Sequence, residues 1–160
     1  MSTKLTLFMV GPAKSGKSAI CNYLAELSDN SSASEYHPTQ GVRILEFERS
    51  ILADAGRANG KPKAVTVAVE LWDCSGDPRH NFFSSLKETQ IAIFAHKPAC
   101  PPQMIPKLRL ANKSLARAAQ AYTSLDFEPE TIRTEFDNLI HNAYTAYTES
   151  REREEQSIVA

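Results

Sequence analysis

The spacing of hydrophobic and polar positions changes several times along the first half of this chain, and each change marks an expected element. Residues 4–10 begin by alternating and then become continuously apolar, which is typical of a strand buried on both faces. Residues 18–27 carry apolar side chains at helical spacing, so a strand, a tight loop and a helix follow one another. Residues 42–48 alternate apolar and charged side chains, and the β-branched residues at 64–72 predict a further strand. Residues 49–63, with two glycines and a proline, predict a long hairpin loop.

The middle of the chain is less regular. Residues 73–80 predict a loop and residues 81–89 a short helix, followed by a buried strand at 90–95. Four prolines within 98–106 predict an irregular segment, because proline removes a backbone donor and fixes φ.

The last third of the chain predicts a short strand, an alanine-rich helical stretch and a final helix. Residues 107–110 are a candidate short strand, and the alanine-rich residues 111–122 have helical propensity. Pro129 suits the first turn of a final helix, where its missing N–H would be unpaired in any case. One face of that helix is apolar at helical spacing and consists of Ile132, Phe136, Leu139, Ile140, Ala143 and Tyr147. Residues 149–156 predict a solvated, charged end.

Length and charge narrow the class of protein. With 160 residues, 42% of them hydrophobic, the chain fits a single core, so we expect one domain over 1–148 and a charged tail over 149–160. A net charge of -1 argues against nucleic-acid binding, which needs a basic excess. No run approaches the roughly 20 apolar residues of a membrane span, and the N-terminal apolar stretch is too short for a signal peptide.

The cysteines and histidines give no sign of a disulfide framework or a metal cluster. Three cysteines without a C-x-x-C pair favour a reducing compartment, so we expect a cytoplasmic protein. The last cysteine is Cys100, so no prenyl acceptor lies near the C-terminus, and we expect no lipid anchor and no direct membrane binding. The four histidines are scattered without the spacing of metal ligands.

The loop after the first strand carries the strongest chemical signal, because it matches the pattern G-x-x-x-x-G-K-S/T. Glycines let the backbone curl so that successive N–H groups point at phosphate oxygens, and the following helix adds its positive end. Lys17 would reach the terminal phosphates and the Ser18 hydroxyl would bind Mg²⁺. The predicted nucleotide-binding residues here are Gly11, Pro12, Ala13, Lys14, Ser15, Gly16, Lys17 and Ser18.

Two weaker motifs follow in the order that this chemistry needs. Asp73 comes at the end of a buried strand, where its carboxylate could hold Mg²⁺, and Gly76 could offer its N–H to a γ-phosphate. Thr39 precedes another strand and places a hydroxyl where it could close over the metal. The predicted metal ligands are therefore Ser18, Thr39 and Asp73.

With these motifs in this order, the sequence resembles the Ras-like small GTPases and, within them, the Rab-like subunits of the intraflagellar transport B complex. The narrower resemblance is carried by residues 34–48, 70–77, 95–98, 128–133 and 149–155. It implies an α/β P-loop NTPase fold in three α/β/α layers with a mostly parallel sheet. It also implies GTP or GDP with Mg²⁺, the coiled-coil subunits of that complex as partners, and a location at the cilium or flagellum and its base.

Three substitutions depart from the family pattern. Asp77 stands where hydrolysing members have the glutamine that orients water, and Ala13 stands where many have glycine, so we expect slow turnover or none and assign no catalytic residue. The guanine-reading N-K-x-D box is replaced by residues 96–99, which lack its carboxylate, so ATP is possible as well. Lys97 can still pack its stem over a base and is a further nucleotide-binding candidate.

A fourth departure is the chain's length. Only twenty-two residues separate Asp73 from His96, where the family has the second switch, a strand and a helix, so one strand and one helix are lacking. Either the sheet re-closes with five strands, or the chain is a shortened splice or gene-model product that folds poorly. In either case we expect reduced stability, because an omitted strand opens two sheet edges.

Three functions remain open at this stage. The first is a nucleotide-binding subunit of the intraflagellar transport B complex that contributes to cilium or flagellum assembly with weak or no hydrolysis. The second is an active GTPase switch that uses a catalytic group supplied by a partner. The third is a small P-loop phosphotransferase, although the chain has no arginine-rich segment resembling a lid.

Overall fold

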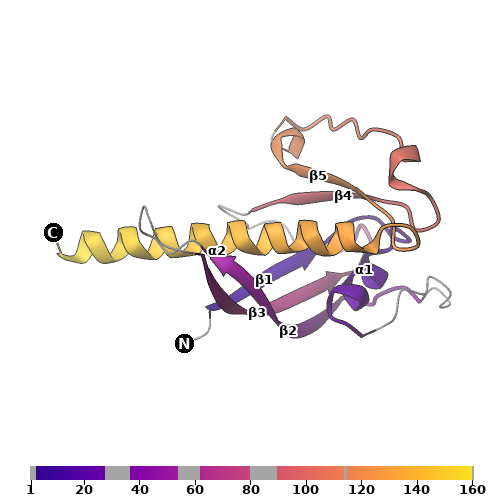
Figure 1. The fold of residues 1–160 in the computed structure, drawn as a ribbon. Helices are drawn as coiled ribbons and strands as arrows, with labels where there is room; N and C mark the ends of the chain where they lie inside the picture. Colours follow the sequence, from indigo (N-terminus) through magenta and orange to yellow (C-terminus); the bar gives the residue numbers. More distant parts are fainter. Residues whose placement is uncertain (1–2, 28–36, 54–61, 80–89, 114, 160) are drawn as a thin grey trace.

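The computed structural model describes residues 3–27, 37–53, 62–79, 90–113 and 115–159. These residues form two sheets and two α-helices (Figure 1). In chain order the elements are β1 (Thr3–Met9), α1 (Lys17–Leu24), β2 (Val42–Ala53), β3 (Lys63–Cys74), β4 (Ala92–His96), the 3₁₀ turns η1 (Pro102–Met104) and η2 (Leu115–Arg117), β5 (Ala119–Thr123) and α2 (Pro129–Val159).

The larger sheet has the strand order β1-β3-β2. The C-terminal ends of β1 and β3 and the N-terminal end of β2 lie at the same edge of this sheet. β1 pairs with β3 in parallel, with Met9 opposite Asp73. β2 pairs with β3 in antiparallel orientation, with Arg43 opposite Asp73. Since all three strands meet at this edge, the loops that leave β1 and β3 and the segment that enters β2 lie side by side.

The smaller sheet is the parallel pair β4–β5, in register from Ala92 opposite Ala119 to His96 opposite Thr123. Five strands are present among the described residues, four of them where they were expected, but the expectation of one re-closed sheet is wrong, because β1 and β4 do not pair. α2 contacts β1, β2 and β5, so it joins the two sheets from one side (Figure 1). Packing on a shared helix therefore replaces strand pairing between the two sheets.

Both α-helices pack on one face of the larger sheet. The core places α1 residues such as Leu24 and α2 residues such as Phe136 against the alternating side chains Val67, Val69 and Leu71 of β3. The opposite face is polar in part, and there Lys4 forms ion pairs with Glu46 and Glu70. Of the three expected layers, the described residues contain the sheet and one helical layer. The short helix expected at 81–89 lies outside the described residues.

The last third of the chain corrects two expectations. Residues 107–110 form no strand, and Ala119–Thr123, expected within a helical stretch, form β5 instead. Here pairing with β4 overrides the helical propensity of alanine, because the small side chain of Ala121 fits into the interior.

α2 is longer than the expected helix and continues through the charged residues 149–156 to Val159 (Figure 1). Its buried face includes Ile132, Phe136 and Ile140 as expected, whereas Tyr147 is 42% exposed. Within the described part of the chain, no helix combines the length and the apolar character that crossing a membrane requires.

Candidate phosphate-binding site

The loop between β1 and α1 curls because three of its residues adopt positive φ values. These are Gly11 (+151°), Lys14 (+62°) and Gly16 (+85°). Gly16 is the N-cap of α1, and its carbonyl accepts the first helical hydrogen bond, from Ile20 N at 3.0 Å. No acidic side chain occupies the first turn of α1, so nothing there opposes an anion at the positive end of the helix.

Lys17 is directed into this loop and is only 9% exposed. Its Nζ donates a hydrogen bond to the carbonyl oxygen of Pro12 at 2.8 Å, and the Ser15 hydroxyl donates to the same oxygen at 2.8 Å. The ammonium group therefore lies across the loop, partly desolvated, where its charge acts strongly on any anion that enters.

Two hydroxyl groups and a carboxylate converge beside the loop. Ser18 Oγ lies 2.9 Å from Thr39 Oγ1, which in turn lies 3.5 Å from Asp73 Oδ2. Asp73 is fully buried, and among the described residues its Oδ1 has no hydrogen-bond partner. Because an unpartnered buried carboxylate oxygen is costly, and because Mg²⁺ prefers oxygen ligands, this arrangement fits a divalent cation. Elsewhere in the described residues, no cluster of three or more His, Cys, Asp or Glu side chains could hold a metal.

Arg43 is a site residue that the sequence reasoning missed. Its Nη2 lies 3.2 Å from Asp73 Oδ2 and 2.7 Å from Asn22 Oδ1 on α1. A signal was present in the alternating strand, where residue 43 falls on the same face as the apolar residues Leu45 and Phe47. A charged residue at a core-facing position needs a partner of opposite charge.

The segments around Gly76 and Thr39, which carry the two weaker motifs, lie close to the loop. Gly76 packs so tightly that a Cβ atom added there would lie 2.3 Å from the backbone nitrogen of Ala13. Ser75 N donates to Gly41 O at 2.8 Å, which ties the segment after β3 to the segment before β2. The fold thus brings together three sequence motifs that lie far apart in the chain.

Asp77 is held by a neighbouring arginine. Both of its carboxylate oxygens lie 3.0 Å from Arg79 Nε, and they also accept from the guanidinium and the backbone N–H of Arg79. The same carboxylate raises the pKa of Arg79. The side chain at the position expected for a water-orienting glutamine is therefore already engaged in an ion pair.

His96, at the end of β4, lies against the loop and was not among the predicted site residues. Its Nδ1 is 3.0 Å from Thr123 Oγ1, and a Cβ atom added at Gly16 would lie 2.7 Å from its Cδ2. Its Nε2 is buried and has no hydrogen-bond partner in the described part of the chain, and burial lowers the pKa of the ring below the ordinary value of 6.5. His96 thus links the smaller sheet to the start of α1.

The turn after His96 is anchored to the connection between β5 and α2. Lys97 N donates to Thr123 O at 3.1 Å, and Asp126 N donates to Pro98 O at 3.4 Å. The Ser124 hydroxyl also donates to Pro98 O. The side chain of Lys97 is exposed, as a residue that covers a base would be, and Asp126, also exposed, is joined to the same turn through its backbone.

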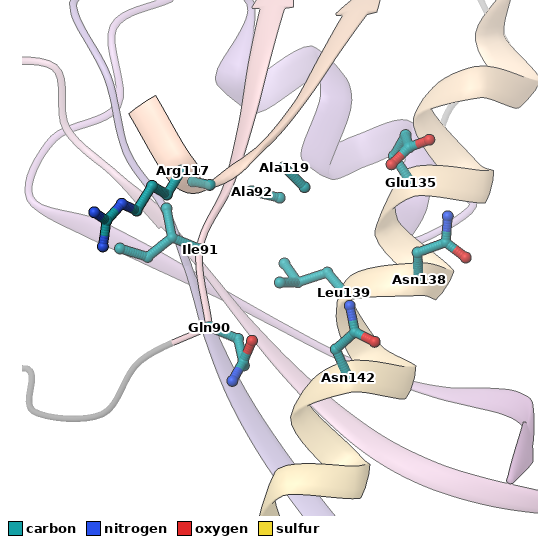
Figure 2. Close-up of a pocket in the computed structure, with 10 residues that line it drawn as sticks. Gln90, Ile91, Ala92, Arg117, Ala119, Glu135, Asn138, Leu139 and Asn142 are labelled. Atoms are coloured by element: carbon teal, nitrogen blue, oxygen red, sulfur yellow. The ribbon is translucent and has the colours of Figure 1, made fainter. Parts of the chain in front are cut away.

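A hollow of about 320 Å³ lies elsewhere, between α2 and the beginnings of β4 and β5 (Figure 2). Figure 2 shows Leu139 and Asn142 of α2 on one side and Ile91 and Arg117 on the other. None of the predicted site residues lines it.

Comparison with known proteins gives relatives over nearly the whole chain, although no protein-family model matches it. The intraflagellar transport protein 22 homologues of cattle and zebrafish are 31% and 32% identical over 198 positions, covering 98% of this chain and 98% of each relative. Intraflagellar transport protein 22 of Trypanosoma brucei is 40% identical over 76 residues, which is 46% of this chain and 33% of that protein. Because alignments of 198 positions exceed the 160 residues of this chain, the two vertebrate relatives contain positions that it lacks.

A solved structure shares the fold. The crystal structure of GDP-bound intraflagellar transport protein 22 from Trypanosoma brucei superposes with a TM-score of 0.59 at 20% identity. The match covers 91% of this chain and 99% of that one.

Proposed function

The chain belongs to the intraflagellar transport protein 22 family, and from that premise we propose that it binds a guanine nucleotide with Mg²⁺ as a subunit of the intraflagellar transport B complex. The expected small-GTPase-like α/β fold is confirmed by the likeness to the trypanosome structure. That protein carries GDP, which supports guanine over adenine for this chain.

The main support for the proposal is the position of the Asp73 carboxylate. The buried Asp73 carboxylate lies at the edge of the curled loop that holds Lys17, with Oδ2 at 3.5 Å from the Thr39 hydroxyl, which contacts Ser18, and with Oδ1 unpartnered among the described residues. A structural aspartate would have both oxygens paired, whereas a metal-binding one keeps an oxygen available.

Each group then has a role that follows from its chemistry. The backbone of residues 11–16 and the positive end of α1 bind phosphate oxygens, and Lys17 neutralises their charge. Ser18, Thr39 and Asp73 would hold Mg²⁺, which when bound neutralises the charge on the terminal phosphates. Gly76 lies against Ala13, so its N–H stands close to the phosphate end of the loop.

The base would lie near the turn at Lys97 and Pro98. Lys97 packs its stem over the ring, as the resemblance implies, and we expect Asp126 to provide the carboxylate that the missing N-K-x-D aspartate would have supplied. Its backbone bond to Pro98 supports this placement.

Hydrolysis by this chain alone is weak or absent in this proposal. Asp77 cannot orient a water molecule as glutamine does, since its oxygens accept hydrogen bonds from Arg79 and its charge repels a γ-phosphate. Ala13 adds a methyl group beside the phosphate end of the loop, where many hydrolysing members have glycine. The chain therefore acts by binding.

Partners and location follow from the family. We propose that nucleotide and Mg²⁺ order the segments around Thr39 and Gly76, and that these segments dock onto coiled-coil subunits of the complex. The protein would then be found in the cytoplasm, at the base of the cilium or flagellum and within it. It would reach membranes through its protein partners.

The test compares the binding of fluorescent GTP, GDP and ATP by the wild-type chain and by Lys17→Ala. Loss of the charged contact is expected to weaken guanine-nucleotide binding by roughly 10- to 100-fold, the equivalent of about 1.5–3 kcal/mol. Lys107→Ala, which removes an exposed lysine outside the site, is the matched control and is expected to bind normally.

Nucleotide binding that survives Lys17→Ala, or no binding by the wild-type chain, would contradict the proposal. Phosphate release is followed in the same samples and is expected to be slow. Fast release of phosphate from GTP would favour an active switch instead, and transfer of phosphate to a second small molecule would favour a phosphotransferase.

A further inference from the structure

The most deeply buried charged residue of the site, Asp73, forms an ion pair with an arginine. Asp73 is fully buried, and among the described residues Arg43 is the side chain that forms an ion pair with it, at 3.2 Å from Nη2 to Oδ2. Lys17, the buried lysine of the site, is instead directed to Pro12 O. Arg43 thus compensates the negative charge of the buried carboxylate.

This ion pair is fixed by the fold and is not an incidental surface contact. Arg43 and Asp73 are direct partners in the β2–β3 register, so the strand pairing places them opposite each other. Asn22 of α1 accepts a second hydrogen bond from the same Nη2 at 2.7 Å. The guanidinium is therefore held between a strand and a helix, already oriented toward the carboxylate.

Two cations would then share one carboxylate. Oδ2 accepts from Arg43 and also lies 3.5 Å from the Thr39 hydroxyl, which contacts Ser18, whereas Oδ1 has no partner among the described residues. A guanidinium on Oδ2 reduces the negative charge that the carboxylate offers to a metal beside these hydroxyls, and the two cations repel each other at this range.

From this geometry we infer that Arg43 is a built-in counter-cation that competes with Mg²⁺ for Asp73. It keeps the carboxylate paired when no metal is present, and it raises the Mg²⁺ concentration that nucleotide binding by this chain requires. This inference rests on the proposed function for its nucleotide part and on the ion pair alone for its metal-free part.

The test uses Arg43→Gln, which keeps hydrogen-bonding capacity and removes the charge. Arg49→Gln is the matched control, because Arg49 lies on the same strand and pairs with another aspartate, Asp137, at 2.8 Å, away from the site. The first measurement is the melting temperature without nucleotide, in a chelator and in millimolar Mg²⁺. Both variants are expected to melt below the wild type in the chelator, and Mg²⁺ is expected to restore Arg43→Gln more than the wild type or Arg49→Gln.

The second measurement is the Mg²⁺ concentration at which bound fluorescent GDP is half retained. Removal of the competing charge is expected to lower that concentration by about tenfold in Arg43→Gln and to leave it unchanged in Arg49→Gln. Asn22→Ala, which loosens the hold on Arg43 and retains both charges, is expected to give an intermediate shift. This milder variant decides the question if Arg43→Gln does not fold.

Two outcomes of these measurements would contradict the competition between Arg43 and Mg²⁺. If Mg²⁺ stabilises the wild type and the site variants to the same degree, or if half-retention needs more Mg²⁺ in the variants, Arg43 does not compete with the metal. If the wild-type chain binds no nucleotide, the proposed function fails, and the nucleotide-free melting measurement still decides the role of Arg43.

Discussion

At the residue scale, the site depends on two close approaches of side chain or backbone to the loop between β1 and α1. Gly76 approaches the loop backbone at Ala13 from the end of β3, and His96 approaches Gly16 from the end of β4. Each contact connects the loop to a different sheet. Substitutions at these positions therefore test how the loop is held.

Replacing Gly76 by alanine should strain the loop. The added Cβ would lie 2.3 Å from Ala13 N, a backbone atom that cannot rotate away, so we expect a loss of about 1–3 kcal/mol, as for overpacking, together with weaker nucleotide binding. Urea unfolding measures the change in free energy.

Gly41→Ala provides the comparison for Gly76→Ala. A Cβ at Gly41 meets no atom of the described residues within 4 Å, so its positive φ of +68° is what opposes the substitution, at about 1 kcal/mol. A smaller loss for Gly76→Ala than for Gly41→Ala would show that the loop yields easily.

His96 should make stability sensitive to acid. Because burial lowers its pKa below 6.5, the unfolded chain takes up the proton first, so the contribution of His96 is complete above that pH and is lost as the pH falls through the lowered value. Asp126 is the acidic group whose charge opposes this shift, and Thr123 accepts or donates at Nδ1.

The measurement is the melting temperature of wild type and His96→Asn over a falling pH series. The variant is expected to lose less stability in acid than the wild type, and His141→Asn, a histidine substitution on α2, is expected to follow the wild type. Parallel curves for wild type and His96→Asn would contradict this prediction.

At the scale of elements, the sequence predicted best where local signals decide the structure. The strand, loop and helix over residues 3–24 were predicted because a buried run, two glycines and helical spacing are properties of neighbouring residues. α2 was predicted for the same reason, from Pro129 and an apolar face. β2 and β3 were also predicted, although each extends further into the hairpin than the alternation indicated.

β5 shows where local signals fail. Its alanines favour a helix in isolation, but Ala121 and Thr123 are buried where β5 pairs with β4. A partner strand more than twenty residues away in the sequence supplies the hydrogen bonds that decide the outcome. Propensity alone could not show that partner.

At the scale of the whole molecule, the division into two sheets should divide its stability as well. β3 has a neighbour on each side and a twelve-residue ladder with β2, whereas β4 and β5 have only each other over five residues among the described strands. Short, parallel, two-stranded pairing is weak on its own and depends on the helix that covers it.

We therefore expect the amide protons of Ala92–His96 and Ala119–Thr123 to exchange with solvent faster than those of the buried half of β3. Hydrogen exchange followed by mass spectrometry measures this by peptide, with β2 as an internal reference for a well-paired strand. Equal protection of both sheets would show that α2 unites them into one cooperative unit.

The sequence by itself determined the phosphate-binding loop, the order of the motifs and the shortage of length between Asp73 and His96, because each is a matter of residue type and spacing. It also placed Ser18, Thr39 and Asp73 in one predicted site. Only the tertiary structure decided that the strands form two sheets and that Arg43 faces Asp73 across the β2–β3 ladder. Both depend on which strands pair and in what register, and those choices are settled by packing between residues that are distant in the chain.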